Sequence, residues 1–108
     1  MLSKVSSQCI LIDCLGMWVS NLLAEPQRDL EQEVQSLLTV VDKYPGTIII
    51  VSNEVGWGLL PMNALGRKFC DLLGKANRLI ANQAAEVWLL VAGFPLNLVE
   101  VADKWRIK

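Results

Sequence analysis

Short apolar runs alternate with longer amphipathic stretches along the chain. The apolar runs cover residues 9–13, 47–52 and 87–92, and polar or turn-forming residues bound each of them. Ile48 to Val51 are consecutive β-branched residues, which is typical of a strand buried on both faces of a sheet. Between the runs, apolar residues recur at helical spacing, so the order predicts a β-α-β-α-β unit.

The amphipathic stretches place the predicted helices. Their apolar stripes cover residues 15–23, 30–41 and 62–80. Pro26 separates the first two stripes, because proline disrupts a helix interior. Right-handed crossovers through the helices make the three predicted strands parallel. Residues 96–101 predict a last short strand, antiparallel to the third one.

Polar residues or a turn follow each predicted strand. Asp13 ends the first run, Asn53 and Glu54 follow the second, and Gly93 follows the third. The carboxyl ends of parallel strands share one edge of the sheet, where ligands bind in α/β folds. These side chains are suited to holding a hydrated Mg²⁺, orienting a hydroxyl or binding a ribose. The alternatives are that Asp13 only caps the next helix and that Asn53 and Glu54 only form a turn.

Length and composition narrow the function classes. The 108 residues suit one small domain, with 53% hydrophobic and 19% charged residues. A small parallel sheet with unprotected edges favours pairing with another chain or membership of a larger fold. The net charge is −1 without a basic block, so we expect no nucleic-acid partner. No apolar stretch approaches the roughly 20 residues that span a bilayer, so we expect no membrane association.

Three observations on residue types limit the chemistry that the chain can carry out. The sequence has no histidine, which removes the commonest general base and a nucleotidyl-histidine intermediate. Its three cysteines lack metal-like spacing, and we interpret them as reduced thiols of a cytoplasmic protein. No G-x-x-x-x-G-K-[ST] motif for cradling phosphates occurs.

Four segments carry a resemblance to a known family. They read DCLGMWVSNLL from residue 13, VSNEVGWGLLP from 51, GRKFCDLLGKANRLIAN from 66 and EVWLLVAGFPLNL from 86. In this order and spacing they resemble the C-terminal part of the bifunctional adenosylcobinamide kinase/adenosylcobinamide-phosphate guanylyltransferase family of cobalamin biosynthesis. The resemblance extends over roughly residues 9–98, and its most specific patterns are S-N-E-V-G-x-G-x-x-P and R-x-F-x-D-x-x-G-x-x-N.

The resemblance implies an α/β, P-loop NTPase-like (RecA-like) fold with a parallel sheet. Family members phosphorylate the aminopropanol hydroxyl of adenosylcobinamide with a nucleoside triphosphate. They then transfer GMP from GTP onto that phosphate through a guanylylated histidine. The implied cofactors are Mg²⁺ and GTP or ATP, the implied substrate is a corrinoid, and the implied assembly is an oligomer with the active site near subunit contacts.

Carried over residue by residue, the resemblance implies nucleotide or substrate binding by Asp13, Gly16, Asn53, Glu54, Arg67, Asp71 and Asn77. Asp13 matches the acidic residue that ends a Walker-B-like strand and contacts Mg²⁺ indirectly. Gly16 stands where the family usually has threonine, Cys70 replaces an arginine, and Arg78 replaces a glutamine.

The family's P-loop and nucleophilic histidine lie N-terminal to every matched segment. We therefore expect residues 1–108 to be a single partial domain, truncated at its N-terminus, with no catalytic residue of its own. Such a chain is expected to be inactive without the missing N-terminal half or a full-length homologue. The alternative is a non-catalytic nucleotide-binding or assembly subunit derived from the family, and a third interpretation is a generic α/β scaffold.

Overall fold

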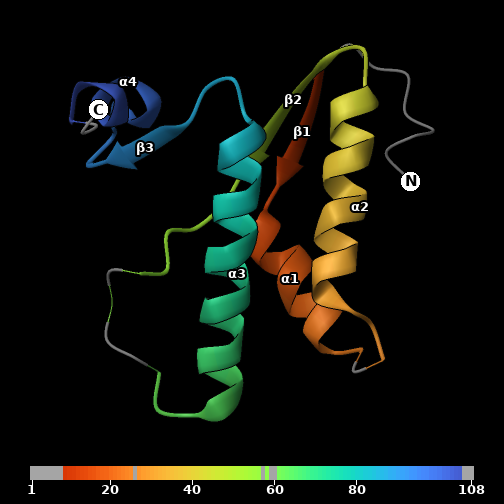
Figure 1. The fold of residues 1–108 in the computed structure, drawn as a ribbon. Coiled ribbons are helices and arrows are strands. Elements are labelled where there is room, and N and C mark those ends of the chain that lie inside the picture. Colours follow the sequence, from red (N-terminus) through yellow and green to blue (C-terminus); the bar gives the residue numbers. More distant parts are fainter. Residues whose placement is uncertain (1–8, 26, 57, 59–60, 106–108) are drawn as a thin grey trace. The chain divides into compact units, whose positions relative to one another are not determined.

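The computed structural model describes residues 9–25, 27–56, 58 and 61–105, and Figure 1 shows the elements in chain order. They are β1 (Cys9–Asp13), α1 (Leu15–Leu23), α2 (Leu30–Lys43), β2 (Thr47–Val51), α3 (Ala64–Gln83), β3 (Trp88–Val91), β4 (Phe94–Asn97) and α4 (Leu98–Trp105). The chain divides into two compact units, residues 1–77 and residues 78–108.

The first unit is built on a parallel pair of strands. β1 pairs with β2 in a register that runs from Cys9 opposite Thr47 to Asp13 opposite Val51. This confirms the first two predicted strands and their parallel direction. Because the strands end in register, the chain leaves both of them at the same edge of the sheet.

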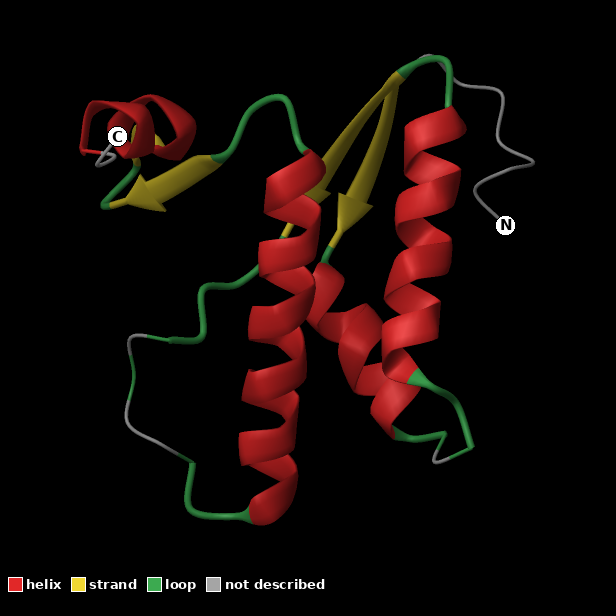
Figure 2. Ribbon diagram, in the orientation of Figure 1, coloured by secondary structure: helices red, strands yellow, loops and turns green. Residues whose placement is uncertain are grey.

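Three helices supply the core of this unit, and Figure 2 shows them together with the two strands. The buried apolar residues of the described chain are Leu15, Val19, Leu22, Val34, Leu38, Leu73 and Ala76. They come from α1, α2 and α3 at the spacing that the apolar stripes predict. The helices therefore hold together through one shared apolar layer.

The sheet of the first unit is covered on one face. Leu11, Ile49 and Val51 are 61%, 50% and 42% exposed, whereas the alternate residues of both strands are half-buried. The prediction that the run from Ile48 to Val51 is buried on both faces is therefore wrong for this chain. The reason is that successive side chains of a strand point to opposite faces. The helices described for this unit cover only one of those faces.

Local capping explains where α2 begins. The carboxylate of Asp29 accepts hydrogen bonds from the backbone N–H groups of Glu31 and Gln32, at 3.0 and 3.4 Å. Glu31 and Glu33 lie in the first turn and Lys43 in the last, which complements the helix dipole. The N-terminus of α2 thus follows from residues adjacent in sequence.

The second unit is a β-hairpin followed by a helix. β3 pairs with β4 in antiparallel fashion, from Trp88 opposite Asn97 to Val91 opposite Phe94. The turn residues Ala92 and Gly93 have φ values of 51° and 81°. Positive φ at both positions is what a two-residue hairpin turn of type I′ requires.

This arrangement revises the predictions for the last third of the chain. The strand predicted at residues 87–92 forms, but it is hydrogen-bonded to β4 in a two-stranded sheet, so a third parallel strand is not confirmed. An antiparallel strand forms, but at Phe94–Asn97, so only residues 96 and 97 of the predicted segment lie in it. The strand prediction is wrong for residues 98–101, which begin α4. There, Asn97 Oδ1 accepts a hydrogen bond from the backbone N–H of Glu100 at 3.1 Å and stabilises a helix start.

Candidate functional site at the carboxyl ends of β1 and β2

The candidate site lies where β1 and β2 end. Asp13 is the last residue of β1, and Ser52, Asn53 and Glu54 directly follow β2. The parallel register confirms that these residues leave the sheet at one edge. All four are exposed, so their polar groups are accessible to a ligand.

Asp13 does not cap the helix that follows it. The N-cap residue of α1 is Cys14, and no side chain makes a capping hydrogen bond there. The interpretation of Asp13 as a helix cap is therefore wrong. Its exposed carboxylate makes no hydrogen bond or ion pair with any other described residue, which leaves both oxygens for a ligand or a hydrated cation.

Asn53 packs against the first turn of α1. A Cβ atom built on the buried Gly16 would lie 3.2 Å from Asn53 Oδ1, and 3.6 Å from Leu73 Cδ2 on α3. Since contacts of 3.0 to 3.4 Å are tighter than most, a side chain at position 16 would displace the carboxamide of Asn53. Gly16 therefore allows α1, α3 and the chain after β2 to meet at one point.

Asn77 on α3 binds the residues after β2 with both ends of its amide. Asn77 Oδ1 accepts a hydrogen bond from Ser52 Oγ at 2.5 Å, and Asn77 Nδ2 donates to the carbonyl oxygen of Asn53 at 3.0 Å. Ser52 was not among the residues singled out from the sequence. The only signal for it is a hydroxyl side chain directly before the Asn53-Glu54 pair.

Glu54 is engaged within its own turn. Glu54 Oε1 accepts a hydrogen bond from the backbone N–H of Gly56 at 2.9 Å, while the side chain stays exposed. The turn interpretation and a binding role are compatible, because the second carboxylate oxygen makes no hydrogen bond in the described chain.

Arg67 and Asp71, on the N-terminal half of α3, do not pair with each other. Arg67 Nη1 donates to the carbonyl oxygens of Pro61 and Met62, at 3.1 and 3.2 Å. Asp71 is exposed and contacts no polar partner within the part of the chain that the structure describes. Of the predicted binding residues, the structure thus brings together Gly16, Asn53 and Asn77, with Asp13 at the same sheet edge.

The carboxylates of the site suit an indirect metal contact better than a direct one. No group of three or more His, Cys, Asp or Glu residues able to hold a metal ion occurs among the described residues. Mg²⁺ usually keeps several of its water ligands, so one accessible carboxylate such as Asp13 fits a contact through water. All three cysteines are free thiols.

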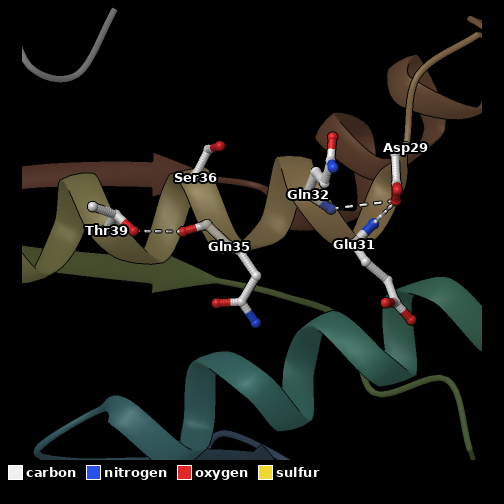
Figure 3. A pocket seen from close by; sticks show the side chains of 6 residues that line it. All are labelled: Asp29, Glu31, Gln32, Gln35, Ser36 and Thr39. Atoms are coloured by element: carbon white, nitrogen blue, oxygen red, sulfur yellow. Dashed lines mark hydrogen bonds between the residues drawn. The ribbon is translucent and has the colours of Figure 1, made fainter.

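A shallow polar concavity on α2 is not a candidate site, and Figure 3 shows why. Its lining residues are Asp29, Glu31, Gln32, Gln35, Ser36 and Thr39. Asp29 caps the helix, Thr39 Oγ1 donates to the carbonyl oxygen of Gln35 at 2.9 Å, and Glu31 pairs with Lys75. Three of the six lining side chains therefore already make contacts within the fold.

The helices of the described chain include none with both the length and the hydrophobicity of a bilayer-spanning segment.

Comparison with known proteins bears directly on this site. The family model for cobinamide kinase / cobinamide phosphate guanyltransferase matches residues 1–98. The bifunctional adenosylcobalamin biosynthesis protein CobP of Pseudomonas aeruginosa is 41% identical over 95 residues, which cover 86% of this chain and 54% of that protein. The protein CobU of Salmonella typhimurium is 34% identical over 103 residues, covering 82% of this chain and 57% of that protein.

CobU of Escherichia coli is 33% identical over 106 residues, covering 85% of this chain and 59% of that protein. The chain thus spans about half the length of the curated relatives it matches. The family model covers residues 1–98, which include the strand ends that carry Asp13, Asn53 and Glu54. The chain therefore belongs to the cobinamide kinase / cobinamide phosphate guanyltransferase family.

Proposed function

We propose that residues 1–108 are one part of a cytoplasmic enzyme of cobalamin biosynthesis and act together with a part that corresponds to the N-terminal half of the relatives. The enzyme phosphorylates adenosylcobinamide and transfers GMP from GTP onto adenosylcobinamide phosphate. In this proposal the phosphate-binding loop and the nucleophilic histidine come from an N-terminal half or from a full-length homologue. The family membership and the partial coverage of the relatives support it.

The bare face of the β1–β2 sheet is the observation that carries the proposal. Leu11, Ile49 and Val51 expose apolar side chains on that face, next to the strand ends that carry Asp13. Parallel sheets are normally covered on both faces, because their strands are linked by crossover helices. A polypeptide that adds strands and helices here would bury this face and bring its own side chains to the candidate site.

Asp13, Asn53 and Glu54 carry the binding role in this proposal. Asp13 holds a water molecule of Mg²⁺, and the metal ion neutralises charge on the phosphate oxygens when nucleotide is bound. Asn53 and Glu54 orient the nucleotide or the corrinoid through the carboxamide and the free carboxylate oxygen. Asp71 makes no polar contact with the described residues, whereas Arg67 and Asn77 already make hydrogen bonds within the fold.

Calorimetric titration with GTP and Mg²⁺ tests the proposal. We expect binding when the chain is mixed with the preceding half of a relative such as CobU of Salmonella typhimurium, and none with the chain alone. Ile49→Lys, which puts a charge on the bare face, should abolish binding by the mixture. Met62→Lys is the matched control, because Met62 is 98% exposed and lies outside the sheet. Tight Mg²⁺-dependent binding by the chain alone would overturn the proposal.

A non-catalytic assembly or nucleotide-binding subunit is the second candidate. The departures from the family pattern at Gly16, Cys70 and Arg78 favour it. In that case the mixture would bind nucleotide or form a stable complex without transferring GMP to adenosylcobinamide phosphate. A radiolabelled-GTP transfer assay on the same mixture separates the two candidates.

A further inference from the structure

We propose that Asn77 and Gly16 are positioning residues. Asn77 fixes the backbone of Asn53, Gly16 lies against its carboxamide, and both residues act on a ligand only through Asn53. This inference rests on the proposed function for the identity of the ligand, and on the geometry alone for the positioning. It differs from the role that the family resemblance implies, in which both positions bind nucleotide or substrate.

Both ends of the Asn77 amide make a hydrogen bond to the chain that follows β2. Its oxygen accepts from Ser52 Oγ at 2.5 Å, and its nitrogen donates to the carbonyl oxygen of Asn53 at 3.0 Å. The two hydrogen bonds join one side chain to consecutive residues at the point where β2 ends. They therefore fix the direction in which the chain leaves the sheet.

The neighbours of Asn77 on α3 hold its backbone in place. Leu73 and Ala76 are 0% and 1% exposed, so the face of α3 beside Asn77 belongs to the core. Because this packing holds the helix backbone at Asn77, the amide reaches the chain after β2 from a fixed position. The position of Asn53 relative to α3 is thus set by the core and not by the loop.

Gly16 fixes the other end of Asn53. Because a Cβ at position 16 would lie 3.2 Å from Asn53 Oδ1, the carboxamide oxygen packs against the first turn of α1. Asn53 is exposed, and neither end of its carboxamide makes a hydrogen bond within the described residues. Because Oδ1 lies against α1, we assign the NH₂ group to a ligand acceptor such as a ribose hydroxyl or a phosphate oxygen.

The first test needs no nucleotide. In ¹⁵N–¹H spectra of the full chain, Asn77→Ala should move the backbone amide signals of Ser52 and Asn53 and the side-chain NH₂ signal of Asn53. Gly16→Ala should move the same NH₂ signal. Asn82→Ala is the matched control, because Asn82 is an exposed asparagine of α3 without a polar contact to any described residue, and it should move none of them.

The second test measures coupling in the nucleotide-binding mixture. Asn53→Ala and Asn77→Ala should each weaken GTP binding by roughly five- to thirty-fold, the equivalent of one lost or misplaced hydrogen bond. The double variant Asn53→Ala/Asn77→Ala should bind no more weakly than Asn53→Ala alone, since Asn77 acts through Asn53. If Asn77→Ala does not fold, Asn77→Asp keeps the acceptor for Ser52 and removes the donor to Asn53.

Additive losses in the double variant would overturn the inference, because they would mean that Asn77 contacts the ligand independently. Unchanged Asn53 signals in both single variants would overturn it as well. If the wild-type mixture fails to bind GTP, the proposed function fails, and the spectra of the nucleotide-free chain still decide the positioning roles.

Discussion

The guanidinium of Arg67 is bonded to the chain that precedes its own helix, with Nη1 donating to the carbonyl oxygen of Pro61 at 3.1 Å. A second acceptor, the carbonyl oxygen of Met62, lies 3.2 Å from the same nitrogen. These carbonyls belong to the last residues before α3, so the arginine closes the loop onto the helix. Arg67 is therefore a structural residue of this loop.

Replacing Arg67 with alanine should lower the free energy of unfolding by about 1 kcal/mol, because two exposed backbone acceptors lose a charged donor. Urea denaturation of the full chain measures the change. The neighbouring Lys68 is exposed and makes no contact with the described residues, so Lys68→Ala should stay within about 0.5 kcal/mol of the wild type. Equal losses in the two variants would show that the loop does not depend on the guanidinium.

The two glycines of α3 should respond to alanine with opposite signs. At Gly66 an added Cβ would lie 2.9 Å from Asn63 Oδ1 and 2.9 Å from Pro61 Cβ. The same Asn63 oxygen accepts the backbone N–H of Gly66 at 2.6 Å. Gly66→Ala must push the loop away and disturb this hydrogen bond, so we expect a loss of about 1 to 3 kcal/mol despite the better helix propensity of alanine.

Gly74 is the matched control for that substitution. The nearest atom to an added Cβ is Val55 Cγ2 at 4.0 Å, which is ordinary contact distance. Gly74→Ala should therefore raise the free energy of unfolding by about 0.5 to 1 kcal/mol through the helix preference of alanine. Thermal and urea denaturation check both signs, and a gain at Gly66 would mean that the loop can shift at no cost.

How much of the fold is predictable from the sequence depends on whether the signal is local. The order β1, α1, α2, β2 and α3 follows from apolar periodicity, and the parallel pairing of β1 with β2 follows from the crossover between them. The sequence predicts an antiparallel strand after β3 but begins it at residue 96, and it predicts β3 as a member of the parallel sheet. The local signal for the tighter hairpin is Gly93, which suits the positive φ of a two-residue turn.

The candidate site is less predictable, because its contacts join distant residues. Ser52 and Asn77 are 25 residues apart, so no local period encodes their hydrogen bond. The sequence does place Asp13 and Asn53 at the ends of neighbouring strands, which the register confirms. What it cannot give is which polar side chains are used up inside the fold, as those of Arg67 and Asn77 are. Ligand binding by the predicted residues stays a prediction.

Leu73 should be the most sensitive apolar position of α3. Its side chain is 0% exposed and lies within the core shared by the three helices of the first unit. Leu73→Ala removes buried methyl groups and leaves a cavity, so we expect a loss of about 2 to 5 kcal/mol, a large part of the stability of a small domain.

Leu65→Ala on the same helix is the matched control. It makes the same change of side chain at a position that is 66% exposed. We expect a change of less than about 0.5 kcal/mol there. Chemical denaturation followed by far-ultraviolet circular dichroism measures both variants. Similar losses at the two positions would contradict the placement of the core.

The ion pair between Lys75 on α3 and Glu31 on α2 should contribute little to stability. The two side chains are 43% and 64% exposed, so solvent screens their attraction. A double-mutant cycle with Glu31→Gln and Lys75→Met should give a coupling energy of about 0.2 to 1 kcal/mol at low salt. That coupling should shrink in about 1 M NaCl, where the screening length falls to about 3 Å. A coupling that stays constant with salt would mean that the pair is shielded from solvent, and that α2 and α3 are held together by more than their apolar layer.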